Sequence, residues 1–146
     1  SMWQGTREFI ETIMGAEDYL EQYFAINIVF EPLVGELFRS GFMVQVAAAN
    51  GDSITPPVIS AAEADYERNL ANTIDLMDLL VRDEVHAAHN KKLFSGWLKK
   101  YEALADKAAT GLQPIWSLPH SKPISFSDVQ EVAKERFSKI KGELGL

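Results

Sequence analysis

The sequence contains no cysteine among its 146 residues. This absence excludes disulfide bonds, thiolate metal sites and cysteine nucleophiles, and it is compatible with the reducing cytoplasm, which is the compartment we expect. Basic residues are also scarce: 14 lysines and arginines stand against 21 acidic residues, and the formal net charge is -7. Because this charge repels the phosphate backbone of a nucleic acid, the composition argues against a nucleic-acid partner.

An uninterrupted apolar run of membrane-spanning length is also missing. The most apolar region, residues 19–49, is broken by Asn27, Glu31, Glu36 and Arg39. A membrane-spanning helix rarely tolerates that many polar and ionisable groups. We therefore expect this region to be buried in protein and predict no membrane partner.

The composition itself is that of a folded globular protein. Hydrophobic residues make up 47% of the chain and charged residues 24%, which is too apolar for a disordered segment. A chain of this length can bury one substantial core. We therefore predict that residues 1–146 form a single helical domain.

Hydrophobic periodicity predicts helices along most of the chain, because apolar residues recur at spacings of three and four. The predicted helices cover residues 3–14, 17–49, 58–81, 84–110 and 127–141. Thr55 and Ser127 are predicted to cap the helices that follow them. Residues 113–123 contain three prolines and are predicted to form a crossing loop. The sum is an all-α fold, a bundle of four to five helices.

The segment over residues 17–49 differs from the other predicted helices, because apolar residues cover most of its circumference. A helix of this kind is buried on several sides. Its β-branched residues would also suit strands, but no alternation with polar residues is sustained, so a helix is favoured. Pro32 and Gly35 are expected to kink it.

Charged residues inside this apolar segment need partners, because an unpaired buried charge is costly. Glu36 and Arg39 are three residues apart and can pair within one helix. The alternative is that Glu31 or Arg39 meets a charge on another subunit.

A carboxylate-bridged di-iron site in a helical bundle needs two Glu-x-x-His pairs besides two further glutamates. The sequence has no such pair. Asp83 with His86 comes nearest, and both are better explained as residues at the start of a helix. We therefore expect no metal ligand, catalytic residue or cofactor-binding residue in this chain. The alternative is a ligand set of Glu31, Glu36, Glu63, Glu67, Asp83 and His86.

Three segments together resemble a known family: FEPLVGELFRSGF at residues 30–42, AEADYERNLANT at 62–73 and GLQPIWS at 111–117. They resemble the hydroxylase small (beta) subunit of soluble multicomponent di-iron monooxygenases, which act on methane, toluene, phenol, propane or acetone, and the propane and acetone branch is nearest. The resemblance implies a ferritin-like helical bundle without iron ligands. Because the family subunit is much longer, it also implies that the chain is the C-terminal portion of such a subunit, with a partial bundle.

The same resemblance implies the partners. A large (alpha) subunit would hold the di-iron centre and activate dioxygen, a reductase would supply electrons from NADH, and a coupling protein would regulate the hydroxylase. The complete system would hydroxylate small hydrocarbons such as propane. The beta subunit would support the alpha subunit structurally.

We expect the apolar segment to contact the partner subunit, and the isolated chain to form a homo-oligomer through it. The predicted interface residues are Phe30, Glu31, Leu33, Val34, Leu37, Phe38, Arg39 and Phe42. Two other functions stay open. One is a self-contained ferritin-like di-iron oxidase that uses the alternative ligand set, and the other is a helical scaffold or binder of an apolar ligand.

Overall fold

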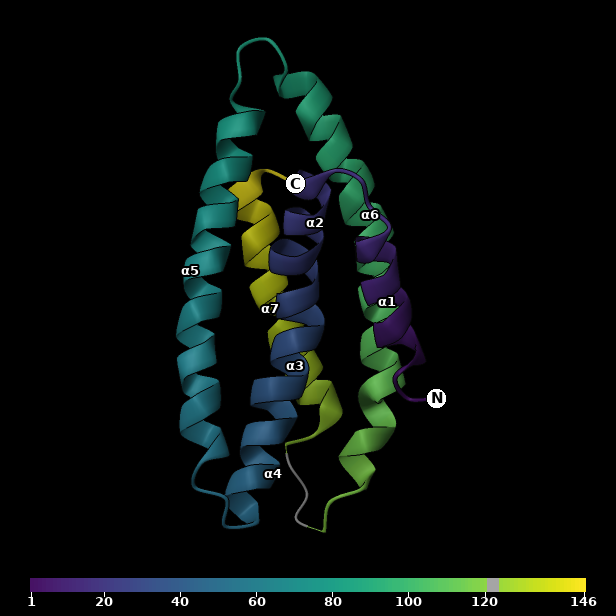
Figure 1. The fold of residues 1–146 in the computed structure, drawn as a ribbon, viewed down its shortest axis with the longest axis vertical. Coiled ribbons are helices and arrows are strands. Elements are labelled where there is room, and N and C mark those ends of the chain that lie inside the picture. The colour runs from purple at the N-terminus through teal and green to yellow at the C-terminus, as the bar shows by residue number, and fades with distance from the viewer. Residues whose placement is uncertain (121–123) are drawn as a thin grey trace.

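The computed structural model describes residues 1–120 and 124–146, which fold into a bundle of helices (Figure 1). No strand occurs in these described residues. The elements are α1 (Gln4–Met14), α2 (Tyr19–Tyr23), η1 (Phe24–Gly35), α3 (Glu36–Phe38), η2 (Arg39–Met43), α4 (Val44–Ala49), α5 (Thr55–Val81), α6 (Ala87–Leu112), η3 (Gln113–Ser117) and α7 (Phe126–Leu144). The prediction of an all-α helical bundle is confirmed.

One continuous helical segment, from α2 to α4, runs through the middle of the bundle (Figure 1). We call these residues, 19–49, the central helix. Its winding widens to π-helical turns in η1 and again in η2. Pro32 and Gly35, where the sequence predicts a kink, both lie in the first of these wide stretches. Such turns are rare and frequently occur at functional sites.

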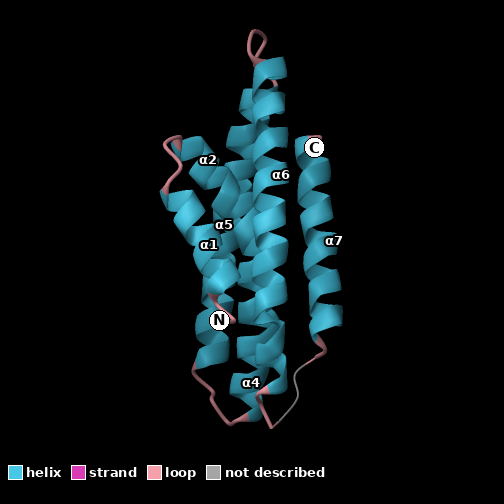
Figure 2. Ribbon diagram, turned by 90° about the vertical axis from the view of Figure 1, so that its right-hand side faces the viewer, coloured by secondary structure: helices cyan, strands magenta, loops and turns pink. Residues whose placement is uncertain are grey.

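Long helices surround the central helix. The antiparallel hairpin of α5 and α6 flanks it, and α7 lies behind it in the view of Figure 1. Helix α1 packs against α6, on the side away from α7 (Figure 2). The side chains that are completely buried at the centre include Phe9, Phe24, Ile28, Val29, Met77 and Tyr101. The prediction that the apolar segment is buried on several sides is therefore confirmed.

Two predicted helix caps are wrong. At the start of α5, the Asp52 carboxylate accepts a hydrogen bond from the backbone N–H of Thr55 at 3.0 Å. Asp52 therefore caps this end of the helix, and Thr55 does not. At the start of α7, the hydroxyl of Ser125 accepts from the N–H of Asp128, and Ser127 lies inside the helix. In both places, the side chain that accepts the hydrogen bond from a free N–H group belongs to a polar residue earlier in the sequence than the predicted cap.

The predicted crossing loop is partly regular. Gln113–Ser117 forms a short 3-10 helix, in which Ile115 and Trp116 are buried. Pro123 lies outside the described residues. Among the helices that the structure describes, none combines the length and the apolar character needed to cross a membrane.

Gly5 lies where α1 crosses α6. A Cβ atom there would come within 2.7 Å of the Lys107 carbonyl oxygen and 2.8 Å of the Ala108 Cα. Since both atoms belong to the α6 backbone, α1 would have to move away. We expect Gly5→Ala to lower the free energy of unfolding by about 1 to 3 kcal/mol, despite the higher helix propensity of alanine.

Urea denaturation measures this effect, with Gly142→Ala as the control. A Cβ atom at Gly142 in α7 meets nothing within 4 Å, so alanine there should leave the stability unchanged or raise it. Equal losses of stability in the two variants would show that close backbone approach at Gly5 is not what matters.

Candidate functional site

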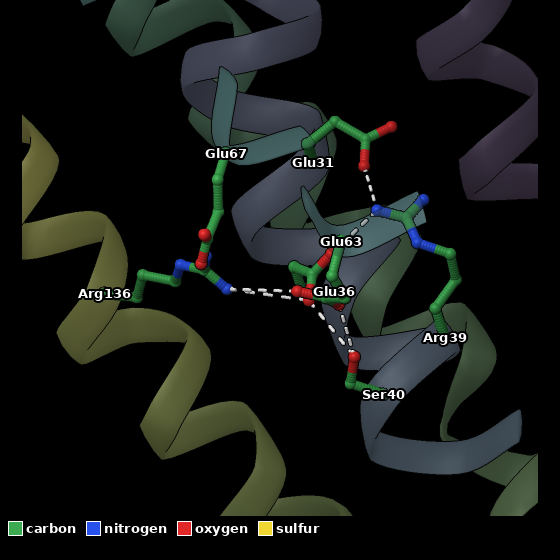
Figure 3. Close-up of polar contacts among 7 residues, drawn as sticks. All are labelled: Glu31, Glu36, Arg39, Ser40, Glu63, Glu67 and Arg136. Carbon is green, nitrogen blue, oxygen red and sulfur yellow. Dashed lines mark hydrogen bonds and ion pairs between the residues drawn. The ribbon is translucent and has the colours of Figure 1, made fainter. Parts of the chain in front are cut away.

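Polar side chains from three parts of the bundle converge beside the central helix (Figure 3). We call this set the carboxylate cluster. Its members are Glu31, Glu36, Arg39 and Ser40 of the central helix, Glu63 and Glu67 of α5, and Arg136 of α7. The four carboxylates outnumber the two guanidinium groups, so the cluster attracts protons and other positive charge.

Arg39 joins two carboxylates of the central helix. Its Nη2 donates to Glu36 Oε1 at 2.8 Å and also to Glu31 Oε2. Gly35 lies midway between Glu31 and Arg39 in the sequence, and a Cβ atom there would come within 2.5 Å of Glu31 Oε2 and 3.1 Å of Arg39 Nη1. A glycine at this position therefore leaves the room that the bridge between Glu31 and Arg39 needs.

Arg136 brings α7 to the same carboxylates. Its Nη1 lies 3.5 Å from Glu36 Oε2 and 4.0 Å from Glu63 Oε2, and its Nη2 lies 3.6 Å from Glu67 Oε1. The guanidinium carbon is also 5.2 Å from the ring centroid of Tyr66, which is buried below it. One arginine thus connects three carboxylates from two helices.

Ser40 completes the contact between the central helix and α5. Its Oγ lies 3.2 Å from Glu36 Oε2 and 2.5 Å from Glu63 Oε1. Because a hydroxyl has a single proton, it can donate to only one of these oxygens at a time. The carboxyl groups of Glu36 and Glu63 are therefore held close together, and they share too few hydrogen-bond donors to stabilise a negative charge on both.

Burial and the hydrogen bond shared with Glu63 raise the pKa of Glu36 to about 7, against the opposing effect of Arg39. For Glu63, burial again opposes ionisation. The hydrogen bonds from Glu36 and Ser40 and the charge of Arg136 outweigh it and lower the pKa of Glu63. With the pKa of Glu36 at about 7, the pair takes up a proton as the pH falls through neutrality.

The geometry favours ion pairing over metal coordination. Each of the four carboxylates lies within 4.0 Å of a guanidinium nitrogen. The described residues contain no group of three or more histidine, cysteine, aspartate or glutamate side chains that could hold a metal ion. The cluster can thus hold the central helix, α5 and α7 together, and it can take up a proton.

The structure separates the alternative ligand set into two places. Glu31, Glu36, Glu63 and Glu67 meet in the carboxylate cluster, whereas Asp83 and His86 lie in the turn between α5 and α6. There, Asp83 Oδ1 accepts from the backbone N–H of His86 at 2.6 Å. This is the helix-start role that the sequence favours for these two residues.

Sequence reasoning did not find Arg136 or Ser40. Arg136 follows Ala133 by three residues and precedes Ile140 by four, and both of these are buried. A charged residue at the edge of an apolar stripe needs a partner in the bundle, which is the signal that could have identified it. Ser40 gives no comparable signal.

Two of the eight predicted interface residues lie inside the bundle. Val34 and Leu37 are 2% and 1% exposed, so the chain's own helices cover them and they are not available to a partner. The remaining residues are partly exposed, and their role at an interface stays a prediction: Phe30, Glu31, Leu33, Phe38, Arg39 and Phe42.

Comparison with known proteins places this chain in a family. The family described as Methane/Phenol/Alkene Hydroxylase matches residues 1–84, which is more than half of the chain and includes all of the cluster except Arg136. The chain belongs to this family. The predicted resemblance is therefore confirmed.

Several individual proteins are also similar to this chain in sequence. A propane 2-monooxygenase hydroxylase component small subunit from Gordonia sp. (strain TY-5) is 47% identical over 94% of this chain and 38% of its own length. The protein of the same name from Rhodococcus jostii (strain RHA1) is 46% identical over 99% of the chain and 39% of its own length. The subunit beta of the toluene-4-monooxygenase hydroxylase component from Ectopseudomonas mendocina is 32% identical over 73% of this chain and 31% of its own length. The chain thus spans about two fifths of the length of the propane relatives.

Proposed function

We propose that the chain is a single helical domain in the C-terminal portion of a hydroxylase small (beta) subunit, and that it supports a large (alpha) subunit structurally. In this proposal it has no active site of its own. The names of its relatives support a place in the hydroxylase component of a multicomponent monooxygenase.

The observation that carries the structural role is the ion pairing of the carboxylate cluster. In di-iron bundles, inward-facing glutamates from several helices hold metal ions. Here the positive charge comes from Arg39 and Arg136. Between them, these two side chains place a guanidinium nitrogen within 4.0 Å of each of the four carboxylates. The residues therefore do not fit a di-iron centre, and they fit a fixed electrostatic crosslink between helices.

The proposal extends to the rest of the system. The di-iron centre belongs to the alpha subunit, a reductase supplies electrons from NADH, and a coupling protein regulates the hydroxylase. The substrate is a small hydrocarbon such as propane, and the assembly works in the cytoplasm. The names of two relatives, which include propane, support this choice of substrate.

We also propose that the chain self-associates when it is separated from its partners. Apolar side chains at the start of the central helix are well exposed: Tyr19 is 65%, Tyr23 51% and Ile26 39% exposed. Exposed groups of this kind usually find a partner, and a symmetric homodimer is the most accessible one. The residues buried in the central helix, such as Leu37, take no part in this contact.

The decisive experiment purifies the full-length subunit together with the products of its neighbouring genes. We expect it to elute with a larger subunit that contains about two irons per polypeptide, as a di-iron centre requires. The separated small-subunit chain should contain no stoichiometric iron. Metal analysis of each separated subunit gives the result. Iron in the small subunit at that stoichiometry would instead support the self-contained oxidase, and failure to elute with any larger subunit would overturn the structural role.

A further inference from the structure

No contact within the described residues explains why position 96 is a glycine. Gly96 lies in the interior of α6 and is exposed, and a Cβ atom there would meet nothing within 4 Å. Glycine in the middle of a helix is destabilising relative to alanine, because it loses more conformational freedom on folding. By contrast, Gly5, Gly35 and Gly41 each lie against atoms that a Cβ would strike.

A shallow hollow of about 310 Å³ opens on the surface at Gly96. It is lined by His89, Lys92, Leu93, Gly96 and Trp97, which share one face of α6. Its floor is fixed: the Trp97 ring packs between the core and the hollow, with ring centroids 5.3 Å from Phe94 and 5.8 Å from Phe24. The hollow is therefore a preformed feature of the bundle.

The rim of the hollow carries positive charge without a partner in the described part of the chain. Lys92 makes no ion pair there, in contrast to Lys100, which pairs with Glu21 at 2.8 Å one helical turn beyond Gly96. Leu93 is 38% exposed beside it. The missing side chain over an apolar floor leaves room for another helix to approach closely, and Lys92 at the rim would attract an acidic group on it.

We propose that the face of α6 centred on Gly96 is a docking site for an amphipathic helix of another polypeptide, with an acidic residue opposite Lys92. This inference rests on the proposed subunit role for the existence of a partner, and it names the surface that the partner covers. A second copy of this chain does not fit as well. A two-fold contact through this face would bring the basic rim of each copy toward that of the other.

The first test concerns the chain alone. We expect Gly96→Ala to raise the melting temperature by about 2 to 4 °C, because alanine favours the helix and no atom of the described residues opposes its methyl group. A lower melting temperature would mean that the fold itself needs this glycine, and the inference would be overturned.

The second test measures binding of the full-length small subunit to the large subunit of its own hydroxylase. We expect Gly96→Leu, which fills the hollow, to weaken the affinity about tenfold or more, and Lys92→Glu to weaken it most at low salt. The matched control is Ala61→Leu, at an exposed position of α5, which should bind as the unaltered subunit does. Circular dichroism of each variant confirms folding.

The outcomes separate this inference from the proposed function. If the unaltered subunit does not bind the large subunit, the subunit role fails. If it binds and both α6 variants bind equally well, the docking site is overturned while the subunit role stands. Slower amide exchange over residues 89–97 in the complex supports the site. A homodimer of the unaltered chain that Gly96→Leu converts to a monomer would assign the face to a second copy and overturn the acidic partner.

Discussion

Arg39→Met is expected to lower the free energy of unfolding by about 2 to 4 kcal/mol. Removing one member of a buried ion pair typically costs about 3 to 5 kcal/mol, because the other charge stays buried without compensation. The Arg39 side chain is 26% exposed and that of Glu31 20%, so solvent screens part of the loss. Glu36, whose side chain is 8% exposed, also loses the hydrogen bond from Arg39 Nη2, and leaving a buried carboxyl oxygen without this donor adds to the loss.

Methionine is a suitable replacement because it keeps most of the aliphatic volume of arginine and removes the charge. Arg39→Lys separates charge from geometry. Lysine retains the positive charge, but it lacks the planar fork that reaches Glu31 and Glu36 together. We therefore expect the lysine variant to recover only part of the lost stability, again by urea denaturation.

Arg68→Met provides the matched control for the ion pair. Arg68 pairs with Asp65 three residues away, as Arg39 does with Glu36, but these side chains are 74% and 64% exposed. Exposed pairs contribute about 0 to 1 kcal/mol. A loss at Arg39 no greater than the loss at Arg68 would refute the role of the carboxylate cluster as a crosslink.

The helices could be predicted from the sequence because their signals are local. Spacings of three and four identify α5, α6 and α7 whatever surrounds them, and the apolar circumference of residues 19–49 required that segment to lie inside. The π-helical turns could not be predicted, since they depend on how the central helix fits its neighbours. The caps at Asp52 and Ser125 were missed for a similar reason, because several polar residues near each start compete for the same N–H groups.

The carboxylate cluster was predictable only in part. The pair of Glu36 with Arg39 follows from a spacing of three residues on one helix. The contacts of Arg136 with Glu63 and Glu67 join α7 to α5, and no local pattern encodes such a distant contact. The sequence did not indicate that Arg136 shares these carboxylates with Arg39, and only the fold shows it.

We expect the stability of the chain to fall by about 1 to 3 kcal/mol as the pH rises from 5 to 8. The cause is Glu36, whose pKa is raised from an ordinary value of 4.5 to about 7 by burial and by its hydrogen bond with Glu63. A shift of one pKa unit corresponds to about 1.4 kcal/mol. The full shift therefore sets an upper limit of roughly 3 kcal/mol, and the proton shared with Glu63 reduces the expected value.

The sign follows from proton binding. Between pH 4.5 and 7 the folded chain holds the Glu36 proton and the unfolded chain has lost it, so raising the pH favours unfolding. The contribution is complete below pH 4.5 and is lost as the pH passes 7. Glu63 has a lowered pKa, so its contribution is present above its ordinary pKa and is lost only at lower pH. The two residues thus act in different pH ranges.

Glu36→Gln tests the assignment, because glutamine resembles the protonated acid: it keeps an N–H donor for Glu63 and cannot ionise. Urea denaturation at intervals between pH 5 and 8 should give a falling free energy of unfolding for the unaltered chain and a nearly constant one for the variant. The three histidines and all surface carboxylates are common to both proteins, so their effects cancel in the difference. Parallel curves for the two proteins would show that Glu36 is ionised throughout this range, and the cluster would then hold no proton at neutral pH.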